Sequence, residues 1–180
     1  RNDAVLVTDV GQQQMNAARY FGFRRTRSVV TSGGLGTMGF GLPAAIGAKL
    51  GAPDREVVLF AGDGGLQMTI QELGTIFQSK IPVKIVLLNN SFLGMVRQWQ
   101  ELFYDRRYSS TEMVNPDFGL IARGNGLSYR CVERREELDE AIAAMKASEG
   151  AFLLEVRVEG EENIFPMVPA GAPVSEIRFE

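Results

Sequence analysis

Residues 57–65 read Val-Val-Leu-Phe-Ala-Gly-Asp-Gly-Gly, an apolar run that ends in a glycine-rich turn around one acidic residue. A second apolar run, residues 83–88, leads directly into Asn89 and Asn90. Both runs have the length and composition of buried strands in a parallel sheet. Ligands bind such sheets beyond the carboxyl ends of the strands. The two polar clusters therefore predict a ligand site at one edge of a sheet.

The side chains in these clusters are typical of a magnesium and diphosphate site. Asp63 offers a carboxylate and Asn90 an amide oxygen, which are ligands that Mg²⁺ prefers, and phosphate oxygens would complete its octahedron. Gly64 and Gly65 would open a helix over about 66–79 and leave backbone N–H groups bare for a diphosphate. Either cluster alone is also typical of a helix cap or a turn.

Apolar and polar periodicities alternate along the rest of the chain. They predict strands near 4–9, 28–30, 57–61, 83–88, 128–132 and 152–158, and helices near 12–20, 38–50, 67–79, 94–104, 117–124 and 135–147. This alternation indicates an α/β fold, with a doubly wound, mainly parallel six-stranded sheet and helices on both faces. We expect one domain over 1–180, ending in an irregular, proline-containing arm at about 160–180 that packs on the surface.

Composition narrows the function classes. The chain has 180 residues, 45% of them hydrophobic, and a net charge of -3 with scattered Lys and Arg, so we expect no nucleic-acid partner. No apolar run approaches a membrane span and no signal peptide is visible, so we expect a soluble, cytoplasmic protein without a membrane partner. The chain has no His, which excludes Ser-His-Asp triads. The lone Cys131 lies in a predicted strand and is expected to be a buried, inert thiol.

Longer stretches point to a family. The order Gly62-Asp63-Gly64, about two dozen residues, then two Asn resembles the metal and diphosphate motif of the thiamin diphosphate (ThDP)-dependent enzymes. The chain also resembles the large catalytic subunit of acetolactate synthase, from near Thr8 to near Pro169. The runs that carry this second resemblance are residues 31–43, 94–100, 102–104 and 165–169.

The resemblance implies an enzyme, a transferase that uses ThDP and Mg²⁺. Its substrates would be pyruvate, which is decarboxylated, and a second pyruvate or 2-oxobutyrate, to which the two-carbon unit is joined. This is the first common step of the biosynthesis of isoleucine, valine and leucine. Another ThDP-dependent 2-oxo-acid decarboxylase, oxidase or carboligase remains an alternative. So does a non-catalytic nucleotide-binding or assembly module.

The resemblance also implies missing parts. Such subunits are about three times longer, and a sequence that begins with Arg1 rather than Met favours a fragment or processed product. We expect this chain to be the carboxyl-terminal diphosphate-binding domain, without the pyrimidine-binding and central domains. It would then hold no catalytic residue, because the essential Glu lies in the absent pyrimidine-binding domain. FAD, held mainly by the central domain, a homodimer or higher oligomer, and a small regulatory subunit are expected for the full enzyme, as is a plastid location in a plant.

Gly11, Gln12 and Gln13 follow the first predicted strand. Their residue types are compatible with a phosphate contact, in which Gly11 admits the phosphate and the two glutamines donate amide hydrogens, or simply with a polar helix start. The related family pattern is Gly-Gln-His-Gln-Met-Trp, and this chain has Gln13 in place of the His and Asn16 in place of the Trp. We expect this departure to affect the strength of diphosphate binding rather than its location.

By the same resemblance, the backbone of Gly36 and Met38 would contact the cofactor's aminopyrimidine. The Met38 side chain would hold the cofactor in its bent shape; from residue type alone, filling a gap in the core is the alternative. Phe92 would give its backbone carbonyl to the metal, beside Asp63 and Asn90.

Met95, Trp99 and Leu102 share one face of a predicted helix, and periodicity alone favours a core stripe. The resemblance instead implies that Met95 borders the cofactor, and that Met95, Val96 and Trp99 line the pocket of the acceptor substrate. Arg97 and Glu101 are interpreted as solvated helix charges.

Overall fold

A computed structural model describes residues 3–179, so residues 1–2 and 180 of the predicted domain lie outside the described residues. Over these residues one six-stranded sheet forms in the order β2-β1-β3-β4-β6-β5, and every neighbouring pair is parallel. The fold class predicted from the sequence is confirmed, and each strand lies within a residue of its predicted bounds. The strands are β1 (Val5–Thr8), β2 (Val29–Thr31), β3 (Val57–Gly62), β4 (Lys84–Asn89), β5 (Ser128–Val132) and β6 (Phe152–Arg157).

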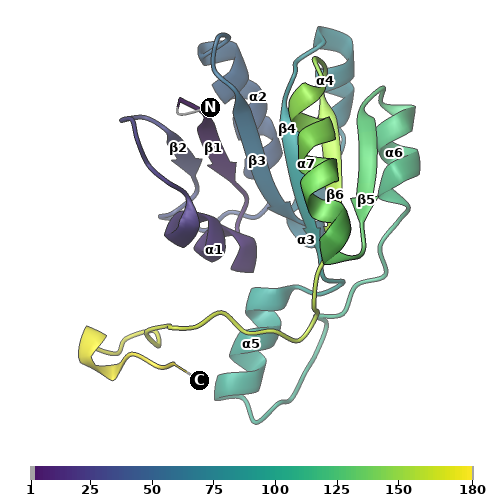
Figure 1. Ribbon diagram of the computed structural model, residues 1–180. Coiled ribbons are helices and arrows are strands. Elements are labelled where there is room, and N and C mark those ends of the chain that lie inside the picture. Colours follow the sequence, from purple (N-terminus) through teal and green to yellow (C-terminus); the bar gives the residue numbers. More distant parts are fainter. Residues whose placement is uncertain (1–2, 180) are drawn as a thin grey trace.

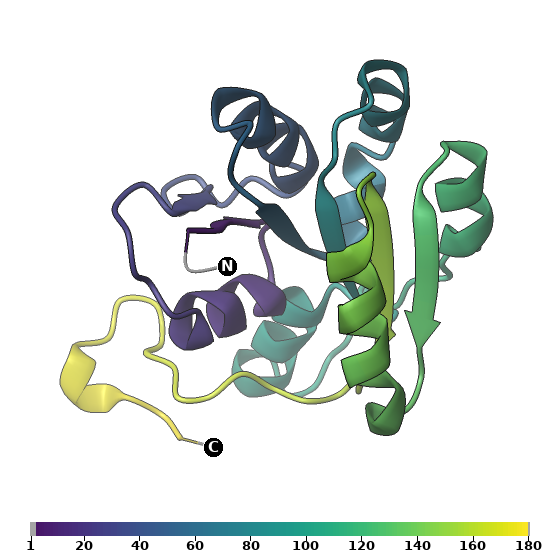
Figure 2. The same ribbon diagram turned by 45° about the horizontal axis from the view of Figure 1, so that its top comes forward.

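Helices cover both faces of the sheet (Figures 1 and 2). One face packs against α2, α3, α4 and α6 around a large apolar cluster, while α7 packs on the other face around a smaller cluster, with α1 beside it. Two-sided burial explains why the central strands are almost continuously apolar. The helices are α1 (Gln12–Tyr20), α2 (Gly41–Gly51), α3 (Asp63–Met68), α4 (Glu72–Ser79), α5 (Gly94–Phe103), α6 (Phe118–Gly124) and α7 (Leu138–Ala147), with 3₁₀ turns η1 (Arg135–Glu137) and η2 (Val174–Glu176).

The order of the strands determines where a ligand-binding crevice opens at the edge of the sheet. From β1 the chain crosses to β2 on one side and then to β3 on the other, so the direction of winding reverses between β1 and β3. Such a reversal opens a crevice at the carboxyl ends of the two strands, because the following loops diverge to opposite faces. β4 lies next to β3, which brings the loops after β1, β3 and β4 to one place.

Two predictions of local structure were wrong. The single helix expected over 67–79 is two helices, because Thr69 leaves the helical conformation and its hydroxyl donates to the carbonyl oxygen of Gly39, 2.9 Å away. A contact with another part of the chain therefore ends α3 early. Cys131 is only partly buried, because β5 is an edge strand of the sheet.

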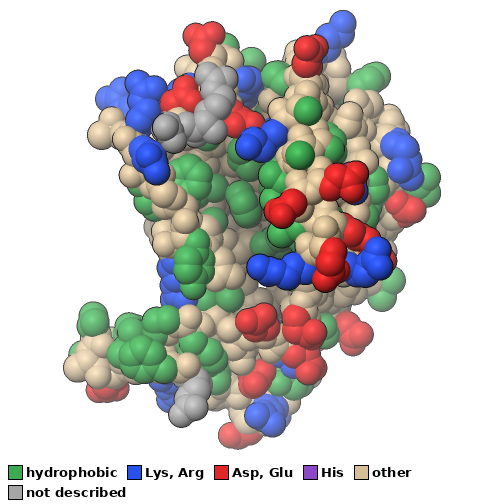
Figure 3. Space-filling model, viewed as in Figure 1, with side chains coloured by type: hydrophobic (Ala, Val, Ile, Leu, Met, Phe, Trp, Pro, Cys, Tyr) green, Lys and Arg blue, Asp and Glu red, His purple; other side chains and the backbone are tan. Residues whose placement is uncertain are grey.

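The last part of the chain leaves the body of the domain (Figure 1). Residues 162–166 are held against α1 and α5, where the buried Gln98 accepts a hydrogen bond from the N–H of Ile164 (2.9 Å) and Arg19 donates to the carbonyl oxygen of Phe165 (2.9 Å). Farther on, Met167 is buried and its sulfur accepts from Nε2 of Gln98 (3.3 Å), and the guanidinium carbon of Arg178 lies 5.2 Å from the ring centroid of Phe103, so these parts of the arm pack on the surface as predicted. The turn between them extends away, and Figure 3 shows apolar side chains gathered on it. Val174 is among these exposed side chains. None of the helices in residues 3–179 has the length and apolar character that a membrane crossing needs.

Candidate cofactor and metal site

A cavity of about 510 Å³ opens at the carboxyl edge of the sheet, beyond β1, β3 and β4. Residues predicted from four separate stretches of sequence meet there, together with residues of the arm. Every predicted cofactor-binding residue lines this cavity: Gly11, Gln12, Gln13, Gly36, Met38, Gly62, Asp63, Gly64, Gly65, Asn90 and Met95. Their contacts with a cofactor stay a prediction, but the fold brings them to one place.

Asp63 lies at the end of β3 and is only 1% exposed. Its carboxylate accepts hydrogen bonds from the N–H groups of Gly64 (3.0 Å) and Ser91 (2.8 Å), and from Nδ2 of Asn115 (2.7 Å). Burial raises the pKa of the Asp63 carboxyl above its usual range, and these hydrogen bonds partly offset that effect. The N–H of Gly64 is therefore already used, and is not bare for a diphosphate as the sequence suggested.

The two asparagines at the end of β4, Asn89 and Asn90, face different surroundings. Oδ1 of Asn90 accepts from the N–H of Phe92 (3.1 Å), and both residues line the cavity. Asn89 is buried, and its amide Nδ2 donates to Glu155 inside the domain (2.8 Å). Only the second asparagine thus faces the cavity, as the predicted metal ligand must.

The predicted donor set fits a small divalent cation. Asp63, Asn90 and Phe92 line one cavity, and a carboxylate, an amide oxygen and a backbone carbonyl are all hard oxygen donors. An ionised carboxylate has about four lone-pair sites, and the three hydrogen bonds to Asp63 leave one of them for a metal. No group of three or more acidic, His or Cys residues within residues 3–179 is arranged to hold a metal ion. A cation here would need ligands from a bound phosphate.

The side-chain amides of Gln13 and Gln12 differ in their hydrogen bonds. Nε2 of Gln13 is buried without a hydrogen-bond partner among the described residues, and it lines the cavity. An unpaired buried donor costs free energy, and a phosphate oxygen would satisfy it. Gln12 was expected to donate as well, but its Nε2 already donates to Oε1 of Gln98 (3.1 Å) and to the carbonyl oxygen of Glu162 (3.0 Å). Both of its amide hydrogens are used, so only Gln13 remains available.

Asp9, at the end of β1, organises the turn around Met38 and was missed by the sequence reasoning. Its carboxylate accepts from the N–H groups of Gly39 (3.1 Å) and Gly41 (2.7 Å), which fixes the start of α2. Gly39 has a φ of +84°, a conformation that favours glycine. This turn holds Met38 at the cavity wall. An acidic residue directly after a buried strand was the signal that could have identified Asp9.

A prediction follows from how closely α3 approaches Asp9. A Cβ added at Gly65 would lie 2.2 Å from Oδ1 of Asp9, a buried carboxylate that its own hydrogen bonds hold in place. We expect Gly65→Ala to lower the free energy of unfolding of the chain by about 1–3 kcal/mol, as overpacking does. Gly74→Ala is the matched control, because Gly74 is also helical and has open space around it. Denaturant unfolding should show the control unchanged or up to about 1 kcal/mol more stable; equal stability of the two variants would contradict the prediction.

The helix α5 presents its apolar face to solvent. Trp99 is 37% exposed and lies with Met95 and Val96 on an open groove of about 880 Å³. Met95 and Val96 also line the cofactor cavity, so the groove and the cavity adjoin. The core stripe that periodicity alone favours is therefore wrong for Trp99 within residues 3–179, and the three predicted acceptor-pocket residues share one groove.

Arg97 is not the solvated helix charge that the sequence suggested. It is 7% exposed and forms ion pairs with Glu101 (3.0 Å) and with Glu161 of the arm (3.1 Å). Its guanidinium carbon lies 5.4 Å from the ring centroid of Phe92 and 4.7 Å from that of Tyr108. The loops before and after α5 and the arm cover this side of the helix, so a charge that looked exposed in the sequence is enclosed.

Comparisons with known proteins place this geometry in a family. Residues 9–156 match the family model described as "Thiamine pyrophosphate enzyme, C-terminal TPP binding domain". The chain belongs to the thiamine pyrophosphate enzymes. The family predicted from Gly62-Asp63-Gly64 and the paired asparagines is thereby confirmed.

Within the thiamine pyrophosphate enzymes, the similar curated relatives include acetolactate synthases. The chain is 48% identical over 176 residues to the isozyme 2 large subunit of Escherichia coli, covering 97% of this chain and 32% of that protein. It is 45% identical over 177 residues to the mitochondrial catalytic subunit of Saccharomyces cerevisiae, covering 98% of this chain and 26% of that one. The chain thus spans between about a quarter and a third of these relatives.

A solved thiamine pyrophosphate enzyme has the same fold. The thiamine diphosphate-dependent 4-hydroxybenzoylformate decarboxylase of Rhodococcus jostii superposes with a TM-score of 0.82 at 30% identity, over 91% of this chain and 31% of that one. The six-stranded parallel sheet with helices on both faces is therefore the family's architecture.

Proposed function

We propose that this chain is the diphosphate- and metal-binding domain of an acetolactate synthase. The full-length protein would decarboxylate pyruvate and join the two-carbon unit to pyruvate or 2-oxobutyrate, with ThDP and Mg²⁺. The observation that carries the proposal is the cavity at the carboxyl edge, which is lined by the oxygen-bearing side chains of Asp63 and Asn90 and by Gln13, whose amide nitrogen is unpaired among the described residues. The acetolactate synthases named above support the choice of reaction.

In this proposal the chain positions the cofactor and the metal ion, and the metal site neutralises the charge of the diphosphate. Asp63, Asn90 and the carbonyl of Phe92 would hold Mg²⁺, and Gln13 would donate to a diphosphate oxygen. ThDP, when bound, supplies the electron sink for decarboxylation. Gly36 and Met38 would orient the aminopyrimidine part. The Glu that exchanges a proton with it is expected in a pyrimidine-binding domain outside this chain.

The same proposal includes the other parts of the enzyme. We propose a central domain that holds FAD, a homodimer or larger homo-oligomer, and a small regulatory subunit. The names "large subunit" and "catalytic subunit" in the relatives support a second kind of subunit. We propose a cytoplasmic location, or the plastid in a plant; one relative, from Nicotiana tabacum, is named chloroplastic.

A second candidate is a decarboxylase without carboligation. The Rhodococcus decarboxylase favours it, because that enzyme shares the fold at 30% identity. Product analysis of the full-length protein with pyruvate, ThDP and Mg²⁺ separates the two reactions: acetolactate supports our proposal, and acetaldehyde alone would overturn it.

Trp99 is expected to set the choice of acceptor. It is a wide, rigid apolar wall beside Met95 and Val96, and contact with one extra methylene is worth about 1–3 kcal/mol. Trp99→Leu should therefore lower the preference for 2-oxobutyrate over pyruvate by about 10-fold or more. Competition between the two acceptors in the full-length protein measures this. Phe77→Leu, an exposed aromatic of α4 outside both cavities, is the control; an unchanged product ratio for Trp99→Leu would remove Trp99 from the acceptor pocket.

A further inference from the structure

A buried carboxylate lies on β6, between β4 and the edge strand β5. Glu155 is 2% exposed and interrupts an otherwise apolar run in β6. It lies opposite Leu87 of β4 and Cys131 of β5, so its side chain shares a face of the sheet with Asn89 and Tyr129, two residues along those strands. A buried acid needs strong partners, and these neighbours provide them.

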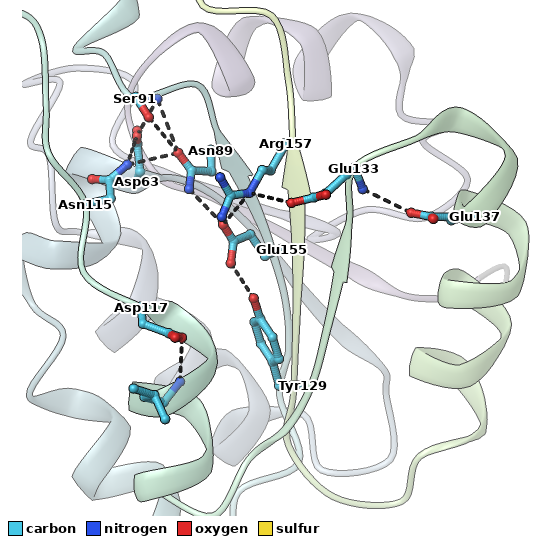
Figure 4. A network of polar contacts seen from close by, with 11 residues as sticks. Asp63, Asn89, Ser91, Asn115, Asp117, Tyr129, Glu133, Glu137, Glu155 and Arg157 are labelled. Atoms are coloured by element: carbon cyan, nitrogen blue, oxygen red, sulfur yellow. Dashed lines mark hydrogen bonds and ion pairs between the residues drawn. The ribbon is translucent and has the colours of Figure 1, made fainter.

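Glu155 accepts hydrogen bonds from both neighbours (Figure 4). The hydroxyl of Tyr129 donates to Oε2 at 2.6 Å, and Nδ2 of Asn89 donates to Oε1 at 2.8 Å. Burial, and then the hydrogen bond to Glu155, raise the pKa of the Tyr129 hydroxyl, which keeps it a donor. Nε of Arg157 also forms an ion pair with Oε1, at 3.7 Å.

The hydrogen bonds continue from Asn89 to the candidate metal ligand. Oδ1 of Asn89 accepts from Nδ2 of Asn115 (2.9 Å), and the same Nδ2 donates to Oδ2 of Asp63 (2.7 Å). Oδ1 of Asn115 in turn accepts from Nε2 of Gln67 (2.9 Å). In this arrangement both the oxygen and the nitrogen of each side-chain amide, Asn89 and Asn115, have hydrogen-bond partners. Turning either amide over would lose some of these hydrogen bonds.

The direction of this chain of hydrogen bonds is set on both sides of Asn89. The carboxylate of Glu155 accepts, so the amide nitrogen of Asn89 points toward it, while the amide oxygen of Asn89 accepts from the N–H of Ser91 (3.2 Å) as well as from Asn115. Without the carboxylate, a turned Asn89 amide would present its nitrogen to the nitrogen of Asn115, and one of them would have to move. The movement would release Asn115 from Asp63.

We infer that Glu155 is a positioning residue of the metal site: through Asn89 and Asn115 it holds the carboxylate of Asp63 in place. This inference rests on the proposed function, because it takes Asp63 as the metal ligand. Partners hydrogen-bonded directly to a metal ligand, as Asn115 is to Asp63, typically change metal affinity by about 10–100-fold when they are removed. Glu155 acts through two further hydrogen bonds, so Glu155→Leu, which keeps the bulk and removes the acceptor, should weaken metal binding by up to about 10-fold.

Binding of Mn²⁺, measured by its paramagnetic resonance in the full-length protein with ThDP, tests the inference without using turnover. Glu155→Leu should lose affinity, as should Asn89→Asp, which places two carboxylates face to face. The double variant Asn89→Asp with Glu155→Gln should recover most of the affinity. In it the new amide donates to the new carboxylate, while the other carboxylate oxygen still accepts from Asn115. A general loss of packing would not be repaired by this exchange.

The control is Lys84→Met. Lys84 is a buried charge in the same sheet, but its Nζ donates to the carbonyl oxygens of Ser148 and Gly150 at the opposite edge (both 2.6 Å). Lys84→Met should lower the melting temperature and leave Mn²⁺ affinity unchanged. If Glu155→Leu does not fold, Tyr129→Phe takes its place and should weaken Mn²⁺ binding to a smaller degree.

The outcomes separate this inference from the proposed function. Unchanged Mn²⁺ affinity in folded Glu155→Leu, or in Tyr129→Phe where that variant replaces it, overturns the inference. So does a double variant as weak as Asn89→Asp alone. In either case, if Asp63→Ala loses Mn²⁺ binding, the proposal that Asp63 is a metal ligand still stands. Wild-type Mn²⁺ affinity in Asp63→Ala overturns the metal site, and the positioning role with it.

Discussion

Replacing Asp63 with Ala is expected to abolish Mg²⁺-dependent ThDP binding in the full-length protein. Asp63 would supply the only formal protein charge to the cation, beside the neutral oxygens of Asn90 and Phe92. The loss should exceed the roughly 10–100-fold that removal of an outer partner causes. Titration calorimetry with ThDP at saturating Mg²⁺ measures it. Undiminished affinity would contradict the metal assignment.

The same substitution should also affect stability. Asp63 is buried and accepts from three donors, so its removal leaves the N–H groups of Gly64 and Ser91 and the amide of Asn115 without this acceptor. Ser91 and Asn115 still donate to Oδ1 of Asn89 (3.2 and 2.9 Å), so the N–H of Gly64 is the one left unpaired among these three, and a buried unpaired donor costs about 1–3 kcal/mol. The matched control is Asp117→Ala, which removes an exposed carboxylate that caps α6 by accepting from the N–H of Leu120 (2.8 Å). It should cost about 1 kcal/mol of stability and leave ThDP binding unchanged.

The strands and the site's location could be predicted from the sequence because both depend on local patterns. The run before Gly62 is apolar along its whole length, as a strand buried on both faces must be, and the polar residues begin where the strand ends. In a parallel sheet the carboxyl ends of neighbouring strands share an edge, so Asp63 and Asn90 had to approach each other once β3 and β4 were neighbours.

Other features depend on how the chain folds back on itself, and local helix patterns do not contain them. Arg97 is buried because the loops on either side of α5, with Phe92 and Tyr108, and Glu161 of the arm, 64 residues away, close around it. Asn115 lies in the loop before α6, and nothing in the sequence of that loop indicates that Asn115 contacts Asp63. Glu155 did leave a signal, a single acid inside an apolar strand, but its partners lie on two other strands.

The 180-residue chain alone is expected to make no acetolactate, even with saturating ThDP, Mg²⁺ and pyruvate. Its cavity offers Asp63, Asn90 and Gln13 to a metal and a diphosphate, but no residue predicted here exchanges a proton with the pyrimidine. The apolar groove beside Trp99 is open to solvent, so water would reach the reacting atoms.

Two measurements check this expectation. Acetolactate formation by the chain should not exceed that of free ThDP, and it should rise when the amino-terminal part of the full-length protein is added in trans and the two pieces associate. Amide hydrogen exchange should be faster in α5 of the lone chain than in α2, because Val96 and Trp99 of α5 are exposed whereas α2 packs on the sheet. Carboligation by the lone chain above the rate of free ThDP would mean that the diphosphate-binding domain also supplies the proton-transfer group, which contradicts the division of roles proposed for the two parts.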